Sequence, residues 1–174
     1  MSLQVELQHL DLGFSPGYRV TQRPSLILGF GDLAASMGMR FGHERDPSYK
    51  YPGDMWNGHR VRMIAACRAA GIDAIDGPFG DYKDDEGYRA QCTWTTTLGA
   101  VGKWCIHPSQ IVHANEIFAP SAQELKVAKR LVEAYEASVT KGAGAVGAGG
   151  ILVDAATARL YQPVIDRAKA LGLL

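Results

Sequence analysis

Acidic side chains in this sequence follow short apolar runs, at positions where they could do chemistry. Asp32 lies in a turn after Leu28, flanked by Gly29 and Gly31, and Asp76 ends the next apolar run. Asp154 ends a third run, Ile151–Asp154. Carboxylates are ligands that Mg²⁺ prefers, and glycines let a ligand approach the backbone closely. The pattern therefore indicates a magnesium site for an oxygen-rich ligand.

Each of these carboxylates also has a purely structural interpretation. Asp32 could cap a helix that starts at Leu33, and Asp154 could cap the last helix of the chain. Asp76 and Asp81 surround a Gly-Pro turn; the structural interpretation there is a turn plus a helix cap, and it is the better one for Asp81. The alternative for Asp154 is an acid–base group on a mobile lid. Residue types alone leave these choices open.

Two other reactive residue types are better interpreted as structural. His107 follows an apolar run with no nucleophile at a fixed spacing, which favours a histidine that hydrogen-bonds neighbouring backbone. Cys105 lies inside the same run, where a thiol is normally inert. Neither residue is expected to catalyse a reaction.

The elements that must position these residues alternate in type along the first two thirds of the chain. Short apolar runs predict buried strands at 25–30, 72–76 and 103–107. Helical spacing predicts helices over 54–70, 84–98 and 108–118, and Gly71 and Gly99 are placed to end the first two. A repeated strand–loop–helix unit is typical of a parallel α/β fold.

The last third of the chain has a different pattern. Ser121 and Glu124 form a capping-box sequence that opens a long helix to about Lys141. Residues 142–150 are only Gly, Ala and Val, which predicts a flexible linker before an extended piece at 151–154 and a helix over 155–171. The linker contains a formal G-x-G-x-x-G, but it lacks the preceding strand that a dinucleotide site requires.

Overall composition excludes several classes of function. The chain has 174 residues, with 18 Lys+Arg against 18 Asp+Glu, so it lacks the basic excess expected of a nucleic-acid binder. No apolar run approaches the roughly 20 residues that cross a bilayer, and no signal peptide is visible at the N-terminus. Three cysteines without metal-type spacing indicate free thiols in a reducing compartment, so we expect a cytoplasmic protein.

Several of these segments together resemble a known family. The segments are Gly29–Gly38, Asp76–Asp81, Gly102–Gln110 and Asn115–Pro120, in this order. They resemble the HpcH/HpaI aldolase and citrate lyase β-subunit-like family. Gly53–Trp56 with Arg60–Met63, and Gly150–Thr157, are similar to its L-malyl-CoA/β-methylmalyl-CoA lyase branch.

The resemblance implies a TIM barrel with a helical C-terminal lid, of which this chain is the C-terminal part, about strands six to eight. It implies that Asp32 and a fifth-strand glutamate hold Mg²⁺ or Mn²⁺, and that Gly29, Phe30, Gly31 and Asp32 bind substrate. It also implies that Asp154 is a catalytic lid residue. The family assembles as trimers or hexamers, so the lid would be exchanged between subunits of a homo-oligomer.

The implied reaction is the reversible cleavage of malyl-CoA or β-methylmalyl-CoA to glyoxylate and acetyl-CoA or propionyl-CoA. In this frame residues 25–120 are a partial barrel, 121–141 a long helix, 142–150 a hinge and 151–174 the lid. Residues 1–24 are unassigned, with a remnant of the fifth βα unit as one interpretation. Glu6 is then a weak candidate for the second metal ligand.

The length departs from the family pattern. A TIM barrel normally takes about 250 residues, and the family's first four strands and its third-strand arginine have no counterpart here. Two alternatives to an active lyase therefore stay open. The chain could be a truncated inactive remnant or an assembly module, or it could be a malyl-CoA thioesterase.

Overall fold

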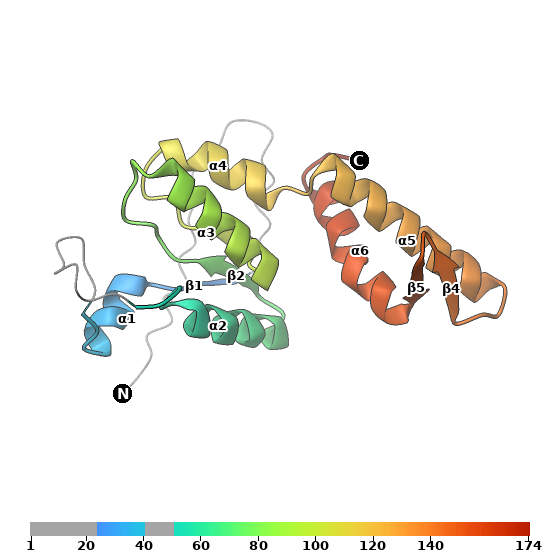
Figure 1. The fold of residues 1–174 in the computed structure, drawn as a ribbon, viewed down its shortest axis with the longest axis horizontal. Coiled ribbons are helices and arrows are strands. Elements are labelled where there is room, and N and C mark those ends of the chain that lie inside the picture. The colour runs from blue at the N-terminus through green and yellow to red at the C-terminus, as the bar shows by residue number, and fades with distance from the viewer. Residues whose placement is uncertain (1–23, 41–50) are drawn as a thin grey trace. The chain divides into compact units, whose positions relative to one another are not determined.

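The computed structural model describes residues 24–40 and 51–174, which divide into two units on either side of the Phe118–Ala119 junction. The first unit has the order β1 (Ser25–Ile27), α1 (Phe30–Ser36), α2 (Asn57–Ala70), β2 (Asp73–Asp76), α3 (Asp85–Leu98), β3 (Gly102–Lys103) and α4 (Ser109–Phe118). The second has α5 (Ala122–Thr140), β4 (Ala145–Ala148), β5 (Ile151–Asp154) and α6 (Ala155–Ala170) (Figure 1).

The first unit is built on a parallel sheet with the order β1-β2-β3. Leu26 is in register with Ala74, and Ile75 with Gly102. All the strands are parallel, so their carboxyl ends, and the turns that follow them, lie at one edge of the sheet. This confirms the predicted α/β class, and the unit is a partial βα structure consistent with part of a barrel.

Helices α2, α3 and α4 build the core of the first unit with the sheet. Met63, Ile64 and Cys67 of α2 pack with Tyr88 and Cys92 of α3 and with Ala74 of β2, and α3 lies beside α4 (Figure 1). The predicted helix stops are confirmed: Gly71 and Gly99 have left-handed backbones with φ of 69° and 108°. Glycine adopts this conformation without the Cβ penalty of other residues.

The predicted strands at both edges of the sheet were too long. β1 ends at Ile27 and Phe30 already begins a helix, so the apolar run 25–30 is split between two elements. β3 covers only Gly102–Lys103, because the Ile106 amide donates to the Gln110 side chain (2.8 Å) and the chain is turning into α4. In the first run the buried Phe30 belongs to a helix, whereas Trp104 and Ile106 of the last run are about half exposed, so neither run is one continuous buried strand.

The second unit is a helical pair with a small β-hairpin. α5 begins with the predicted capping box, since the Ser121 hydroxyl accepts from the Glu124 amide and Glu124 accepts from the Ser121 amide. Ala128 and Val132 of α5 pack against Ile165 of α6. No helix in the described ranges is long and apolar enough to span a membrane.

The predicted flexible linker at 142–150 is wrong as a description of local structure. Ala145–Ala148 form β4, which pairs antiparallel with β5, so that Val146 lies opposite Val153. Gly149 and Gly150 make the turn between them with φ of 62° and 83°. Two adjacent residues with positive φ suit a tight hairpin turn, for which Gly-Gly is a favoured sequence. The glycines here serve a turn.

Candidate functional site at the carboxyl ends of the strands

The turn after β1 presents Asp32 at the start of α1. Gly29 is the N-cap residue of α1, and the Leu33 amide donates to the Gly29 carbonyl at 3.1 Å. Asp32 is therefore already in the first helical turn and makes no cap hydrogen bond, so the cap interpretation of Asp32 is wrong. Its side chain is exposed. The amides of Phe30, Gly31 and Asp32 precede the first intrahelical bond and have no acceptor within the helix.

β2 ends in a buried carboxylate that lies between two cations. Asp76 is fully buried, and it accepts from Arg60 Nε at 2.8 Å and from Lys103 Nζ at 2.6 Å. Arg60 Nη1 also pairs with Asp54. Asp76 is thus neither a turn residue nor a cap, which corrects the structural interpretation of this carboxylate. We refer to Asp54, Arg60, Asp76 and Lys103 as the ion cluster.

Lys103 is held as tightly as Asp76. Besides Asp76, its ammonium donates to the Gly77 carbonyl at 2.8 Å and to the Gln91 side chain at 2.5 Å. Burial lowers the pKa of Lys103, and the neighbouring Asp76 carboxylate opposes that shift. An ammonium has three donors, and here all three have acceptors. Lys103 is therefore occupied as a structural cation.

Phe30 connects the first turn to the ion cluster. Its ring is buried and stacks on Trp56, with centroids 4.7 Å apart and planes at 20°. The guanidinium carbon of Arg60 lies 4.8 Å from the centroid of the Phe30 ring. Gly77 passes so close that an added Cβ would lie 2.8 Å from Phe30 and would overlap the Leu28 carbonyl. The turns after β1 and β2 are therefore packed directly against each other.

Asp154 caps α6. Its Oδ1 accepts from the amides of Thr157 (2.9 Å) and Ala156 (3.0 Å), and from the Thr157 hydroxyl at 3.2 Å. These bonds, the one from the Thr157 amide first, lower the pKa of Asp154. The cap interpretation is confirmed. One carboxylate oxygen carries all three of these bonds.

The residues interpreted as structural have structural partners. His107 Nδ1 lies 2.9 Å from the Ser109 hydroxyl, and the ring stacks on Tyr82. The Cys105 thiol lies 3.2 Å from the Tyr88 hydroxyl, and burial raises the pKa of Tyr88. Burial also raises the pKa of Cys92 to about 11. The Cys92 thiol is therefore protonated at neutral pH, and all three cysteines are free.

The described residues do not by themselves assemble a metal site. Within 24–40 and 51–174 no three His, Cys, Asp or Glu side chains gather in a way that could hold a metal ion. Asp32 offers one exposed carboxylate, and Glu6 lies outside the described residues. The donor set for Mg²⁺ is therefore incomplete in this part of the chain.

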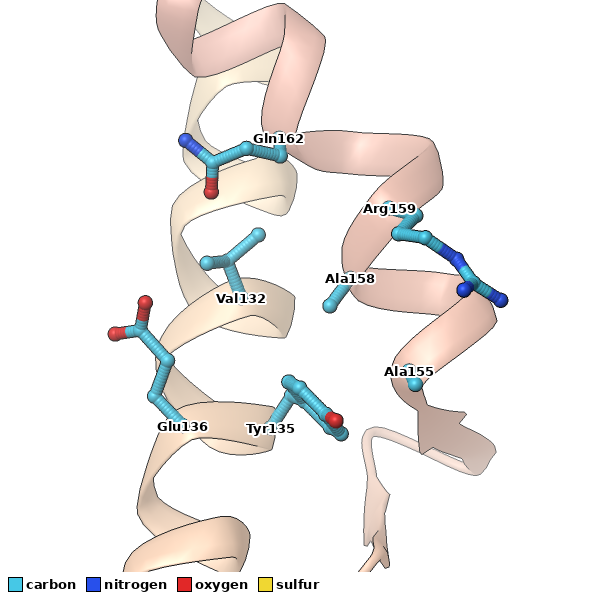
Figure 2. Close-up of a pocket in the computed structure, with 7 residues that line it drawn as sticks. All are labelled: Val132, Tyr135, Glu136, Ala155, Ala158, Arg159 and Gln162. Atoms are coloured by element: carbon cyan, nitrogen blue, oxygen red, sulfur yellow. The ribbon is translucent and has the colours of Figure 1, made fainter.

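A shallow groove of about 390 Å³ lies between α5 and α6 (Figure 2). It contains none of the predicted site residues, although Ala155 lines it next to Asp154. Its remaining lining residues are Val132, Tyr135 and Glu136 of α5 and Ala158, Arg159 and Gln162 of α6. The groove thus belongs to the packing of the helical pair.

Sequence reasoning missed Arg60 and Lys103 as partners of Asp76. Arg60 is four residues after buried Trp56 and three before buried Met63, so it occupies the apolar face of α2. A charged residue on a buried helix face needs a buried partner of opposite charge. That signal was present in the sequence, but the identity of the partner required the fold.

The fold and the site define a class of protein: a parallel βα structure with a carboxylate in the turn after its first described strand. The model of the HpcH/HpaI aldolase/citrate lyase family matches residues 20–108, and the chain belongs to this family. An L-malyl-CoA/β-methylmalyl-CoA lyase of Rhodobacter capsulatus is 42% identical over 154 residues, which are 83% of this chain and 48% of that protein.

Two further comparisons extend this result. A (3S)-malyl-CoA thioesterase of Cereibacter sphaeroides is 34% identical over 74% of this chain and 42% of its own length. The crystal structure of CitE from Mycobacterium tuberculosis, in complex with magnesium, acetoacetate and coenzyme A, matches with a TM-score of 0.63 and 28% identity. That match covers 82% of this chain and 51% of CitE. The chain therefore spans about half the length of the curated relatives it matches.

Proposed function

We propose that this chain is the C-terminal part, about strands six to eight and the lid, of a Mg²⁺-dependent carbon–carbon lyase. The enzyme cleaves malyl-CoA or β-methylmalyl-CoA reversibly to glyoxylate and acetyl-CoA or propionyl-CoA. The observation that carries this proposal is the 42% identity to a lyase of that name across 83% of the chain. The parallel βα units and the exposed carboxylate after β1 fit the proposal.

The chemistry assigns a role to each candidate residue. In the cleavage direction a base takes the substrate hydroxyl proton, the C–C bond breaks, and its electron pair passes to the acyl-CoA enolate, which is then protonated. The backbone amides of Phe30, Gly31 and Asp32, in the turn that Gly29 opens, would bind the oxo-acid carboxylate. Asp154 would move the proton, in the site of a neighbouring subunit. Its lowered pKa keeps the carboxylate unprotonated at neutral pH but makes it a weaker base, so the role rests on the resemblance of Gly150–Thr157 to the family.

Magnesium enters this proposal through Asp32. The solved relative holds magnesium, and a bound Mg²⁺ or Mn²⁺ would supply Lewis-acid polarisation of the aldehyde oxygen. Asp32 is one candidate ligand and Glu6 the weak second one. Because the described donor set is incomplete, the site would need ligands from outside the described residues.

Assembly and location follow from the same resemblance. We propose a homo-oligomer, a trimer or hexamer, in which residues 151–174 act as a lid on a neighbouring subunit. The free thiols of Cys67, Cys92 and Cys105 fit a reducing compartment such as the cytoplasm. Light scattering of the purified chain measures the assembly directly.

The deciding experiment measures malyl-CoA cleavage with Mg²⁺ by the isolated chain, by detection of glyoxylate. We expect Asp32→Asn to lose at least about tenfold in kcat/KM and in Mg²⁺ affinity, because metal-site groups have effects of this size. Asp81→Asn is the matched control, since the exposed Asp81 side chain also follows a neighbouring strand and accepts a turn hydrogen bond from the Lys83 amide. Full activity in Asp32→Asn would overturn the metal assignment.

The thioesterase relative supports a second candidate function. Hydrolysis of malyl-CoA releases free CoA and malate without glyoxylate, so a thiol assay run beside a glyoxylate assay separates the two reactions. If the folded wild-type chain shows neither product, the chain is an inactive remnant or an assembly module.

A further inference from the structure

We propose that Arg60 and Asp76 are positioning residues: the ion cluster beneath Phe30 holds the Gly29–Asp32 turn in the place from which Asp32 and the backbone amides act. The proposal rests on the proposed function for the meaning of that turn. That the cluster holds Phe30 in place is a separate statement, which rests only on contacts within the first unit.

The ion cluster joins two helices to the carboxyl ends of two strands. Arg60 comes from α2, Asp76 ends β2, Lys103 ends β3, and Gln91 of α3 accepts from Lys103. Arg60 and Asp76 have side chains only 1% exposed, and that of Lys103 is fully buried. The cluster is therefore fixed from several directions.

The charges of the cluster are balanced. Burying them costs hydration free energy, which indicates that the cluster serves to orient side chains more than to stabilise the fold. Two cations, Arg60 and Lys103, face two carboxylates, Asp54 and Asp76. Buried ion pairs lose hydration that their attraction often only offsets, and apolar residues of equal volume are commonly as stabilising. What such a cluster adds over an apolar core is direction, because its hydrogen bonds fix the orientation of each group.

Besides its two carboxylate partners, Arg60 contacts the ring of Phe30. Nε and Nη1 are bonded to Asp76 and Asp54, while Nη2 is buried and has no hydrogen-bond partner among the described residues. The guanidinium lies over the Phe30 ring, with Cζ 4.8 Å from the centroid. Lys103 Nζ lies 5.9 Å from the same ring. Cations attract the π face of an aromatic ring, most strongly where water is excluded.

Phe30 links the ion cluster to the turn that carries Asp32. It is the first residue of α1 and lies two residues before Asp32, so its ring position sets where the helix starts and where its free amides point. Trp56 covers the ring by stacking, and Gly77 leaves no space beyond it. A shift of Arg60 is therefore expected to move the turn that carries Asp32.

Trp56 provides a direct probe of this arrangement. Trp94 and Trp104 are the other tryptophans, and both are about half exposed, whereas Trp56 is 4% exposed. A Trp94→Phe, Trp104→Phe background therefore leaves a single tryptophan, stacked on Phe30. Acrylamide quenching of its fluorescence reports whether the stack is closed, independently of metal or activity.

The test compares Arg60→Met with Arg89→Met in this background. Arg89 forms an exposed ion pair with Glu116 between α3 and α4, so it undergoes the same chemical change away from Phe30. We expect Arg60→Met to raise the quenching of Trp56 at least about twofold and to weaken Mg²⁺ binding, measured by calorimetry, by roughly tenfold. Arg89→Met should change neither. Asp76→Asn, which keeps the shape of the side chain, should follow Arg60→Met.

The outcomes separate the two proposals. Unchanged quenching of Trp56 in folded Arg60→Met and Asp76→Asn overturns the positioning role, whatever the activity of the chain. Raised quenching without any change in Mg²⁺ affinity or kcat/KM, in an active wild type, also overturns it, because the turn would then tolerate the movement. If wild type binds no Mg²⁺ and cleaves no substrate, the proposed function fails while the quenching still decides whether the cluster holds Phe30. Arg60→Lys replaces Arg60→Met if the latter does not fold, and should be intermediate.

Discussion

Asp154 caps α6, and the proposed function also makes it the residue that moves a proton. Its Oδ1 holds the first turn of α6 through two amides and a hydroxyl. Asparagine caps helices about as well as aspartate, but its amide is not ionisable and cannot take up and release a proton. The two roles can therefore be separated by substitution at this one residue.

We expect Asp154→Asn to keep the melting temperature of the chain, and Asp154→Ala to lower it by a few degrees, because only alanine removes the acceptor for the α6 amides. Both variants should lose lyase activity if Asp154 moves a proton. Thermal melting by circular dichroism and the glyoxylate assay measure the two effects. Wild-type activity in Asp154→Asn would leave Asp154 as a cap alone.

The lowered pKa of Asp154 also predicts a pH dependence. A depressed folded-state pKa means that the carboxylate stabilises the fold above its unfolded pKa, about 3.9, and that this stabilisation is lost as pH falls through the folded value. We expect wild type to lose stability on acidification over this window more steeply than Asp154→Asn. Urea melts from about pH 5 down to about pH 2 give the comparison, and parallel slopes for the two proteins would contradict it.

At the scale of helices and strands, sequence signals were reliable where the hydrogen-bond partners lie within a few residues of each other. The capping box of α5, the glycine stops of α2 and α3 and the extended piece before α6 were all predicted and are confirmed. The strand ends and the glycine-rich segment were not. β4 exists because β5 pairs with it, and composition alone resembled that of a linker.

Gly77 lies where the chain segments after β1 and β2 are in contact, so the fold should be sensitive to any side chain added at this position. We expect Gly77→Ala to destabilise the fold by about 3 kcal/mol or more, because the added Cβ overlaps the Leu28 carbonyl and Phe30. Gly58→Ala is the control: Gly58 is exposed within α2 with open space around it, so alanine should stabilise by up to about 1 kcal/mol. Urea denaturation followed by Trp56 fluorescence measures both. Equal midpoints would show that the turns can separate at little cost.

At the scale of the whole molecule, the described chain has two units with separate cores. One core lies around Cys67, Tyr88 and Cys92, and another around Ala128 and Val132. The chain spans about half the length of its relatives, and the three described parallel strands leave β1 and β3 as edges within the described sheet. Unpaired edges invite pairing with further strands.

The two units should unfold in separate transitions. All three tryptophans, Trp56, Trp94 and Trp104, lie in the first unit, while α5 and α6 contribute to circular dichroism but not to tryptophan fluorescence. We expect the two signals to give different urea midpoints, and Asp154→Ala to shift only the circular dichroism curve. Coincident curves for both proteins would instead indicate one cooperative unit.

The sequence by itself determined the α/β class, the family and the positions of most helices, because periodicity, caps and family motifs are local properties of the chain. It also placed Asp32 and Asp154 at element boundaries, without deciding which of them caps a helix. Only the tertiary structure decided that, since a cap depends on where the helix begins. The same holds for the ion cluster: Asp76 is 16 residues from Arg60 and 27 from Lys103 in sequence. Their charges meet only because β2 pairs in parallel with β3 and α2 packs against β2.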